Sequence, residues 1–192
     1  MKSITGKMRR HFARQEKLQE KVQRICRAVI RDCSRAVSAL HRGDGRLAGL
    51  LIRRGGQNLR RLETMLDQEG WGMLYNTVVS AQQEYAEAVM LQRLLRGENL
   101  PDFSQLGVLP RAYAFALSDV VGELYRALLN RMRTGDPSGS ERILGQMEEI
   151  YEGLMELDFP QSVLPGMKHR LDRVRRIVEQ ARRDLTIAFA EG

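Results

Sequence analysis

Apolar residues recur every three or four positions over most of the chain, which is the spacing of one face of an α-helix. Turns and Gly- or Pro-containing breaks divide this pattern into six runs. The runs extend from about Gly6 to His41, from the following turn to about Asp67, to just before Gly97, onward from Pro110, onward from the break GDPSGS, and from about Met167 to Phe189. The segment GENLPDFSQLGVLP is predicted to be a loop. The expected fold is all-α, an antiparallel bundle of six to seven helices in a single domain over residues 1–192.

The third run is apolar almost all round and contains a pair of glutamates. Between Leu74 and Leu95 only Glu84, Glu87 and Arg93 are charged, so this helix should be largely buried. Glu84 and Glu87 lie about 60° apart around the helix. No Lys or Arg stands three or four residues from either glutamate, where a helix normally pairs a carboxylate. Because so much apolar surface is hard to bury in one six-helix chain, we expect a closed homo-oligomer.

A second acidic pair, Asp119 and Glu123, occurs in the run that opens at Pro110. Only Glu123 has a cation at helical spacing, Arg126. Oxygen-rich clusters in apolar surroundings suit Mg²⁺ or Mn²⁺, so the four carboxylates predict a divalent-metal site for phosphodiester chemistry. The alternative is that they are structural or solvated. Four further glutamates opposite an apolar face have the pattern of a solvated surface: Glu148, Glu149, Glu152 and Glu156.

Basic charge is concentrated in the first third of the chain. The net charge is +7, but residues 1–70 hold 17 Lys and Arg against 7 Asp and Glu, whereas residues 71–192 hold 14 against 17. The first run carries a basic stripe roughly 37 Å long, a length suited to nucleic acid. Snorkelling beside a core stripe is the alternative interpretation. The predicted RNA-binding residues are Arg10, Arg14, Lys17, Lys21, Arg24, Arg53, Arg54, Arg60 and Arg61.

Several other classes of protein lack support in the sequence. No apolar run has the length of a membrane span and the N-terminus has no signal-like stretch, so we expect a cytoplasmic protein without a membrane partner. Cys26 and Cys33 are about 10 Å apart along one helix, too far to form a disulfide with each other. The three histidines show no metal-ligand spacing, and no phosphate-binding Gly-rich loop is present.

The motifs QEYAEAV and SDVVGELYR, in this order, resemble the translin and Trax family, and specifically its Trax branch. The order of elements is also similar: a long basic first helix, an Arg-rich second helix, the two acidic helices, a Gly-Asp turn and a last helix rich in Leu, Val and Arg. The resemblance covers about residues 10 to 190. This chain is shorter than the eukaryotic Trax pattern and lacks an evident nuclear-localisation tail, which favours a homo-oligomeric prokaryotic or archaeal form.

The resemblance implies a hollow octamer that encloses RNA and cuts it with the carboxylates of the Trax-type subunit and a divalent metal. On this chain Glu87 and Glu123 would hold Mg²⁺ or Mn²⁺, with Glu84 and Asp119 as further ligands or bases. The expected function is therefore a metal-dependent endoribonuclease acting on short duplex or single-stranded RNA. DNA is a further potential ligand. The alternatives are a non-catalytic RNA- or DNA-binding oligomer of translin type and a helical scaffold that binds no nucleic acid.

Overall fold

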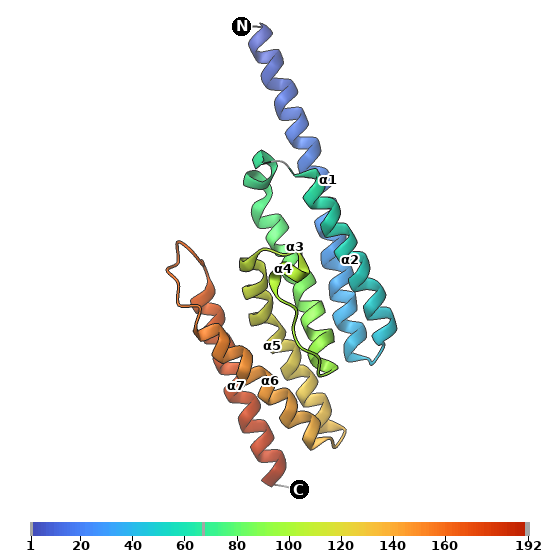
Figure 1. The fold of residues 1–192 in the computed structure, drawn as a ribbon, viewed down its shortest axis with the longest axis vertical. Helices are drawn as coiled ribbons and strands as arrows, with labels where there is room; N and C mark the ends of the chain where they lie inside the picture. Colours follow the sequence, from blue (N-terminus) through green and yellow to red (C-terminus); the bar gives the residue numbers. More distant parts are fainter. Residues whose placement is uncertain (1, 67, 191–192) are drawn as a thin grey trace.

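The computed structural model describes residues 2–66 and 68–190 and confirms the all-α prediction (Figure 1). These residues form seven helices and no strand. The helices are α1 (Lys2–His41), α2 (Gly45–Met65), α3 (Gln68–Leu95), α4 (Phe103–Leu106), α5 (Pro110–Arg133), α6 (Pro137–Met155) and α7 (Met167–Ala190). None of the helices in the described ranges combines the length and hydropathy needed to cross a membrane.

Two helix starts differ from the sequence prediction because aspartates cap them. The predicted loop after Gly97 contains the short helix α4, whose start is closed by a capping box between Asp102 and Gln105. The break GDPSGS is mostly helical, because the Asp136 side chain accepts from the backbone N–H of Gly139 and α6 already begins at Pro137. The predicted boundary at Asp67 falls outside the described residues.

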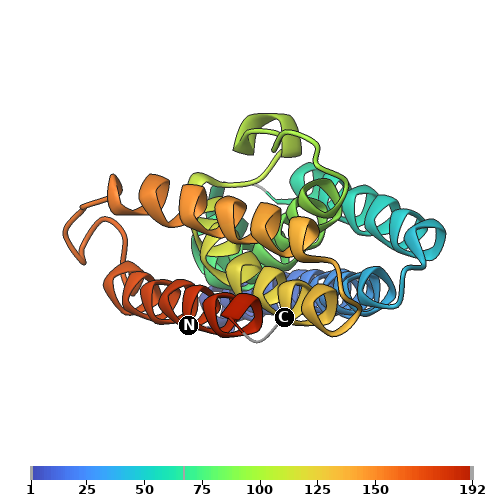
Figure 2. The same ribbon diagram turned by 90° about the horizontal axis from the view of Figure 1, so that it is seen from below.

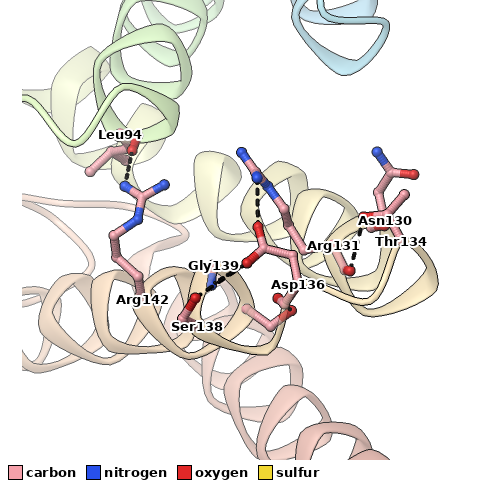
Figure 3. Close-up of polar contacts among 9 residues, drawn as sticks. Leu94, Asn130, Arg131, Thr134, Asp136, Ser138, Gly139 and Arg142 are labelled. Atoms are coloured by element: carbon pink, nitrogen blue, oxygen red, sulfur yellow. Dashed lines mark hydrogen bonds and ion pairs between the residues drawn. The ribbon is translucent and has the colours of Figure 1, made fainter.

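The same aspartate fixes the connection between α5 and α6 (Figure 3). Arg131, in the last turn of α5, donates to Asp136 at 2.6 Å, so one carboxylate joins the end of one helix to the start of the next. One turn into α6, Arg142 donates to the backbone carbonyl of Leu94 at 3.2 Å. The same carbonyl also accepts from the backbone N–H of Gly97 and from the Gln146 side chain, so these bonds tie α6 to the end of α3.

Helix α3 lies between two apolar clusters. One cluster is built from α1, α2 and α3, and includes Val29, Leu51 and Val78. The other is built mainly from α3, α5, α6 and α7, and includes Met90, Leu124 and Val178. Viewed along the long axis, α1, α5 and α7 follow one side of the molecule and α2, α3 and α6 the other (Figure 2).

The burial of α3 changes the argument for an oligomer. Its apolar residues from Leu74 to Leu94 are mostly buried within the chain itself, because α1 and α5 cover it on two sides. The apolar excess of this helix therefore does not require a second subunit, contrary to the sequence argument. Exposed apolar side chains instead occur on the part of α1 that extends beyond the other helices: Ile4, Met8 and Phe12, each more than half exposed.

The Gly55-Gly56 step of α2 is a close helix contact. A β-carbon on Gly56 would stand 2.8 Å from the Tyr85 hydroxyl oxygen, and one on Gly55 would stand 3.2 Å from the Cys33 sulfur. Both cysteines are buried free thiols, in agreement with the sequence. The two glycines therefore allow α2 to approach α1 and α3 where no larger residue fits.

We expect Gly56→Ala to lower the free energy of unfolding by about 1–3 kcal/mol, because the new methyl group overlaps the Tyr85 ring. Gly145→Ala is the matched control, since Gly145 is exposed within α6 and has open space around its α-carbon. That control should gain up to about 1 kcal/mol from helix propensity. Urea unfolding measures both, and equal gains in the two variants would contradict the close contact.

Candidate active site

Glu84 and Glu87 are half-buried on α3. Among the described residues, neither carboxylate makes a hydrogen bond or an ion pair. Burial raises the pKa of Glu87 to about 8, with further contributions from the negative charges of Glu84, Asp119 and Glu123. Burial also raises the pKa of Glu84, followed by the charges of Asp119 and Glu123. The structure therefore brings all four predicted carboxylates into one electrostatic cluster.

Asp119, on α5, is held by cations that the sequence pattern did not reveal. It accepts two hydrogen bonds from Nη1 of Arg170, at 2.8 and 2.9 Å, and a further one from Arg173. Gln83, next to Glu84 in the sequence, also donates to Asp119. The Asp119 side chain is only 18% exposed. Asp119 is thus a tie between α3, α5 and α7 rather than an uncompensated charge.

Arg170 is itself fixed by its surroundings. Its guanidinium carbon lies 4.3 Å from the centre of the Phe115 ring, and Nη1 donates to the Ser118 hydroxyl at 3.1 Å. Arg173, one turn later on α7, is half exposed. Of the two arginines, Arg173 is the one that solvent or a ligand can reach.

Glu123 is paired with a histidine at the end of α1. Nε2 of His41 donates to Oε2 of Glu123 at 2.5 Å, and Arg126 stands 4.0 Å away. The hydrogen bond from His41 lowers the pKa of Glu123, so this carboxylate stays ionised at neutral pH. The His41 side chain is 8% exposed and Glu123 is 28% exposed. Asp119 and Glu123 are therefore engaged with protein partners, whereas Glu84 and Glu87 are not.

The cluster offers oxygen donors of the type that Mg²⁺ and Mn²⁺ prefer. Glu84 and Glu87 have no partner among the described residues, and burial, followed by the negative charge of neighbouring carboxylates, raises their pKa values. Within the described residues, however, no three His, Cys, Asp or Glu side chains are arranged around one point as a metal would require. A bound ion would use the two α3 glutamates directly, and Glu123 or Asp119 would join them only by turning from His41 or the arginines.

The basic stripe of α1 forms one wall of a groove. The groove has a volume of about 670 Å³ and is closed on its far side by Met65 at the end of α2. Its polar lining consists of Arg10, Arg14, Lys17 and Lys21. Lys21 precedes His41 by 20 residues, which is about 30 Å along the helix axis. The groove and the acidic cluster therefore share α1 but lie well apart on it.

The remaining predicted RNA-binding residues have different surroundings, although all nine side chains are exposed. Arg54 donates from Nε to Asp32 at 2.6 Å, and Asp32 is 1% exposed, so Arg54 neutralises a buried carboxylate. Its guanidinium is therefore engaged with Asp32, and its role in RNA binding stays a prediction. Arg53 faces a separate cavity between α2 and α3. Arg24, Arg60 and Arg61 remain on the surface.

The comparison cluster on α6 has the surroundings predicted for it. Glu149, Glu152 and Glu156 are exposed, and Glu148 pairs with Arg182 of α7 at 2.5 Å. Sequence reasoning missed His41, Gln83, Arg170 and Arg173. All four contact their carboxylates across 36 or more positions, so local spacing carried no signal for them. The one sequence signal for His41 was its position at the end of a helical run, where a side chain can reach a neighbouring helix.

We expect the stability of the protein to fall as the pH rises from about 5 to 8. Because folding raises the pKa of Glu87 to about 8, its neutral form favours the folded state at low pH, and this contribution is lost as the pH passes about 8. Glu87→Gln should remove this pH dependence. At pH 9 its free energy of unfolding should be higher than that of the wild type by a few kcal/mol, on the order of 1.4 kcal/mol per pKa unit. Urea unfolding across this range tests it, with Glu152→Gln as the solvated control. Parallel curves for Glu87→Gln and the wild type would contradict the burial of an uncompensated charge.

Comparison with known proteins supports the fold and its family. No family model matches the sequence. The chain is 27% identical over 180 residues to the uncharacterized protein MJ0175 of Methanocaldococcus jannaschii, covering 91% of this chain and 78% of that protein. It is similar to the crystal structure of AfC3PO, with a TM-score of 0.89, 26% identity and 97% of each chain covered. It is also similar to AfC3PO in complex with duplex RNA, with a TM-score of 0.78, 25% identity and 97% of each chain covered. Apo-NeC3PO shares the fold, with a TM-score of 0.86 and 17% identity over 96% of each chain. These C3PO structures are of the translin type, and together with the acidic motifs their similarity to this chain supports a translin/Trax-family member.

Proposed function

We propose that this chain is an RNA-binding, divalent-metal-dependent endoribonuclease of the Trax-like type that works as a closed homo-oligomer. The observation that carries this proposal is the Glu84–Glu87 pair, half-buried, unpartnered among the described residues and next to two further carboxylates. Such a pair is unfavourable in the free protein, and functional sites are where unfavourable ionisable groups concentrate. A bound cation would turn the repulsion into coordination.

RNA binding has support from the chain itself and from a relative. The α1 groove places Arg14, Lys17 and Lys21 side by side on one wall, with spacing that follows the helix axis. Such a row can neutralise successive phosphates without reading sequence. AfC3PO, which this chain resembles over 97% of its length, has been solved with duplex RNA. The substrate we infer is therefore RNA, recognised through its backbone.

The catalytic role is assigned to the acidic cluster. A divalent ion held there by carboxylate oxygens would activate water and stabilise charge on the scissile phosphate. Glu84 and Glu87 would supply the ligand oxygens and release the proton that Glu87 carries at neutral pH. His41 orients Glu123, and Arg170 orients Asp119. The half-exposed Arg173 is placed to contact a phosphate oxygen of the substrate.

The proposed assembly, an octamer of this chain, has support from the free end of α1. Ile4, Met8 and Phe12 follow one another at four-residue spacing and so share one face of the helix. More than half of each side chain is exposed on a segment that other helices do not cover (Figure 1). Exposed apolar surface of this kind marks protein–protein contacts. We infer that a second copy of the chain covers it, since the chain is similar to AfC3PO.

One observation favours a second candidate function. Asp119 is paired with the two α7 arginines and Glu123 with His41, so two of the four carboxylates already have partners without metal. A protein that only binds RNA would need nothing further at this site. The non-catalytic RNA-binding oligomer is therefore the competing proposal, and a cleavage experiment with metal separates the two.

We expect Mn²⁺ or Mg²⁺ to raise the melting temperature and to be required for cleavage of a labelled RNA, with EDTA abolishing both effects. Glu87→Gln should reduce cleavage by about 100-fold or more and remove the metal-dependent rise in melting temperature, while RNA affinity stays equal or increases. Glu84→Gln should act in the same direction. Both variants test the unpartnered pair, which can be changed without breaking a described contact.

Glu152→Gln, on the solvated face of α6, controls for the loss of one carboxylate. Asp119→Asn is less informative, because it breaks the ties to Arg170 and Arg173 and should lower stability in its own right. Full metal-dependent cleavage by Glu87→Gln would exclude the assignment of the site. Absence of cleavage by the wild type with either metal, together with tight RNA binding, would establish the non-catalytic alternative.

We expect the triple variant Arg14→Ala, Lys17→Ala and Lys21→Ala to weaken binding of all RNA sequences alike. The slope of log affinity against log salt concentration should become shallower by about 2 to 3, because binding with fewer phosphate contacts releases fewer counterions. A charge-matched triple outside the groove, Arg133→Ala, Lys168→Ala and Arg175→Ala, is the control. Equal loss of affinity in both triples would show that net charge rather than the groove determines binding.

A further inference from the structure

A second basic cavity lies between the start of α2 and the end of α3. Its volume is about 350 Å³, and its lining includes Arg46 and Arg53 of α2, Gln92 of α3 and Arg96 just after α3. The start of α2 and the end of α3 lie near each other in the lower half of Figure 1. The three arginines come from positions 46, 53 and 96, so only the fold brings them together.

The hydrogen-bond donors of this cavity converge over two glycines. A β-carbon on Gly49 would stand 3.4 Å from Nη1 of Arg53 and 3.6 Å from Nε2 of Gln92. A β-carbon on Gly45, one turn earlier, would stand 3.8 Å from Nη2 of Arg96. The floor of the cavity is therefore open backbone, with nitrogen donors along its edge.

One of these donors is buried and unsatisfied. Nε2 of Gln92 has no hydrogen-bond partner among the described residues, although it is shielded from solvent. A buried donor without a partner costs free energy that an acceptor in the cavity would recover. The acceptor must come from outside, because the cavity lining contributes only arginines, an isoleucine and glycines besides Gln92.

The charge around the cavity is strongly positive. Arg46 and Arg53 make no ion pair with any residue that the structure describes. Arg96 stands 3.8 Å from Glu98, but that carboxylate is closer to Arg93, at 2.9 Å. Asp44, which precedes the cavity in sequence, caps α2 by accepting from the backbone N–H of Leu47 at 2.9 Å. Three guanidinium groups therefore face the cavity with little compensation.

This cavity is separate from the acidic cluster. At 100° per residue, Gln92 lies about 80° from Glu84 and about 140° from Glu87 around α3. Gln92 lines the cavity with residues of α2, whereas the two glutamates interact electrostatically with Asp119 and Glu123 of α5. A ligand here would not contact the proposed catalytic residues.

We propose that this cavity binds a phosphate group, with Arg46, Arg53 and Arg96 as cations and Gln92 as a neutral donor. A tetrahedral anion with several acceptor oxygens matches converging planar guanidinium donors and one amide. The ligand is either a free phosphate ion or a phosphate of bound RNA, and both present the same chemistry. The site does not depend on the proposed nuclease activity, because it uses none of its residues.

Isothermal titration of the full chain with inorganic phosphate, without RNA or divalent metal, tests the site. We expect saturable binding that weakens about tenfold or more in Arg53→Gln and in Gln92→Leu. Gln92→Leu is the decisive variant, since it changes no charge and removes an unsatisfied donor. Its melting temperature should equal or exceed that of the wild type while phosphate binding is lost. Arg133→Gln, an exposed arginine elsewhere, is the charge-matched control and should bind phosphate like the wild type.

Two results would overturn the proposal: no saturable phosphate binding by the wild type at millimolar concentration, or unchanged affinity in Gln92→Leu. A titration repeated with saturating RNA identifies the source of the phosphate. Competition between the two assigns the cavity to RNA phosphates, whereas independent binding assigns it to a free phosphate ion. Because the readout is phosphate binding, failure of the cleavage experiment leaves this result unaffected, and the reverse also holds.

Discussion

Helix α3 packs against apolar side chains on opposite sides, and this double burial determines where its polar residues can lie. Its buried face toward α1 and α2 includes Val78 and Ala81, and its buried face toward α5 and α6 includes Met90 and Leu94. Glu84 and Glu87 lie between these two faces, so they are held at half burial by the packing of the bundle rather than by contacts of their own.

The four carboxylates consequently fall into two kinds. Asp119 and Glu123 are fixed by partners from α7 and α1, and those partners join the two halves of the bundle. The α3 glutamates have no such partner among the described residues and keep a high proton affinity. Under the proposed function, a cation would bind at the unpartnered glutamates without breaking the contacts that hold Asp119 and Glu123.

Much of this organisation could be predicted from the sequence, because helical periodicity and the Glu-Tyr-x-Glu motif are local signals. The helices and the burial of α3 follow from such signals. The cations around Asp119 could not be predicted, since Arg170 lies 51 positions away and only the packing of α7 against α5 brings it there. The pairing of Arg54 with Asp32 was hidden in the same way, because a stripe of charges does not reveal which member faces a buried acid.

Helix α1 is a single rod of 40 residues, roughly 60 Å long, with an uncovered apolar ridge at one end and His41 at the other. A rod of this length acts as a lever. A tilt of about 5° at its packed end displaces the free end by about 5 Å, the height of one helical turn. The packing of Val22, Val29 and Ala36 against the bundle therefore determines the direction in which the projecting segment of α1 points. Small changes deep in the core translate into large changes in where two molecules can meet.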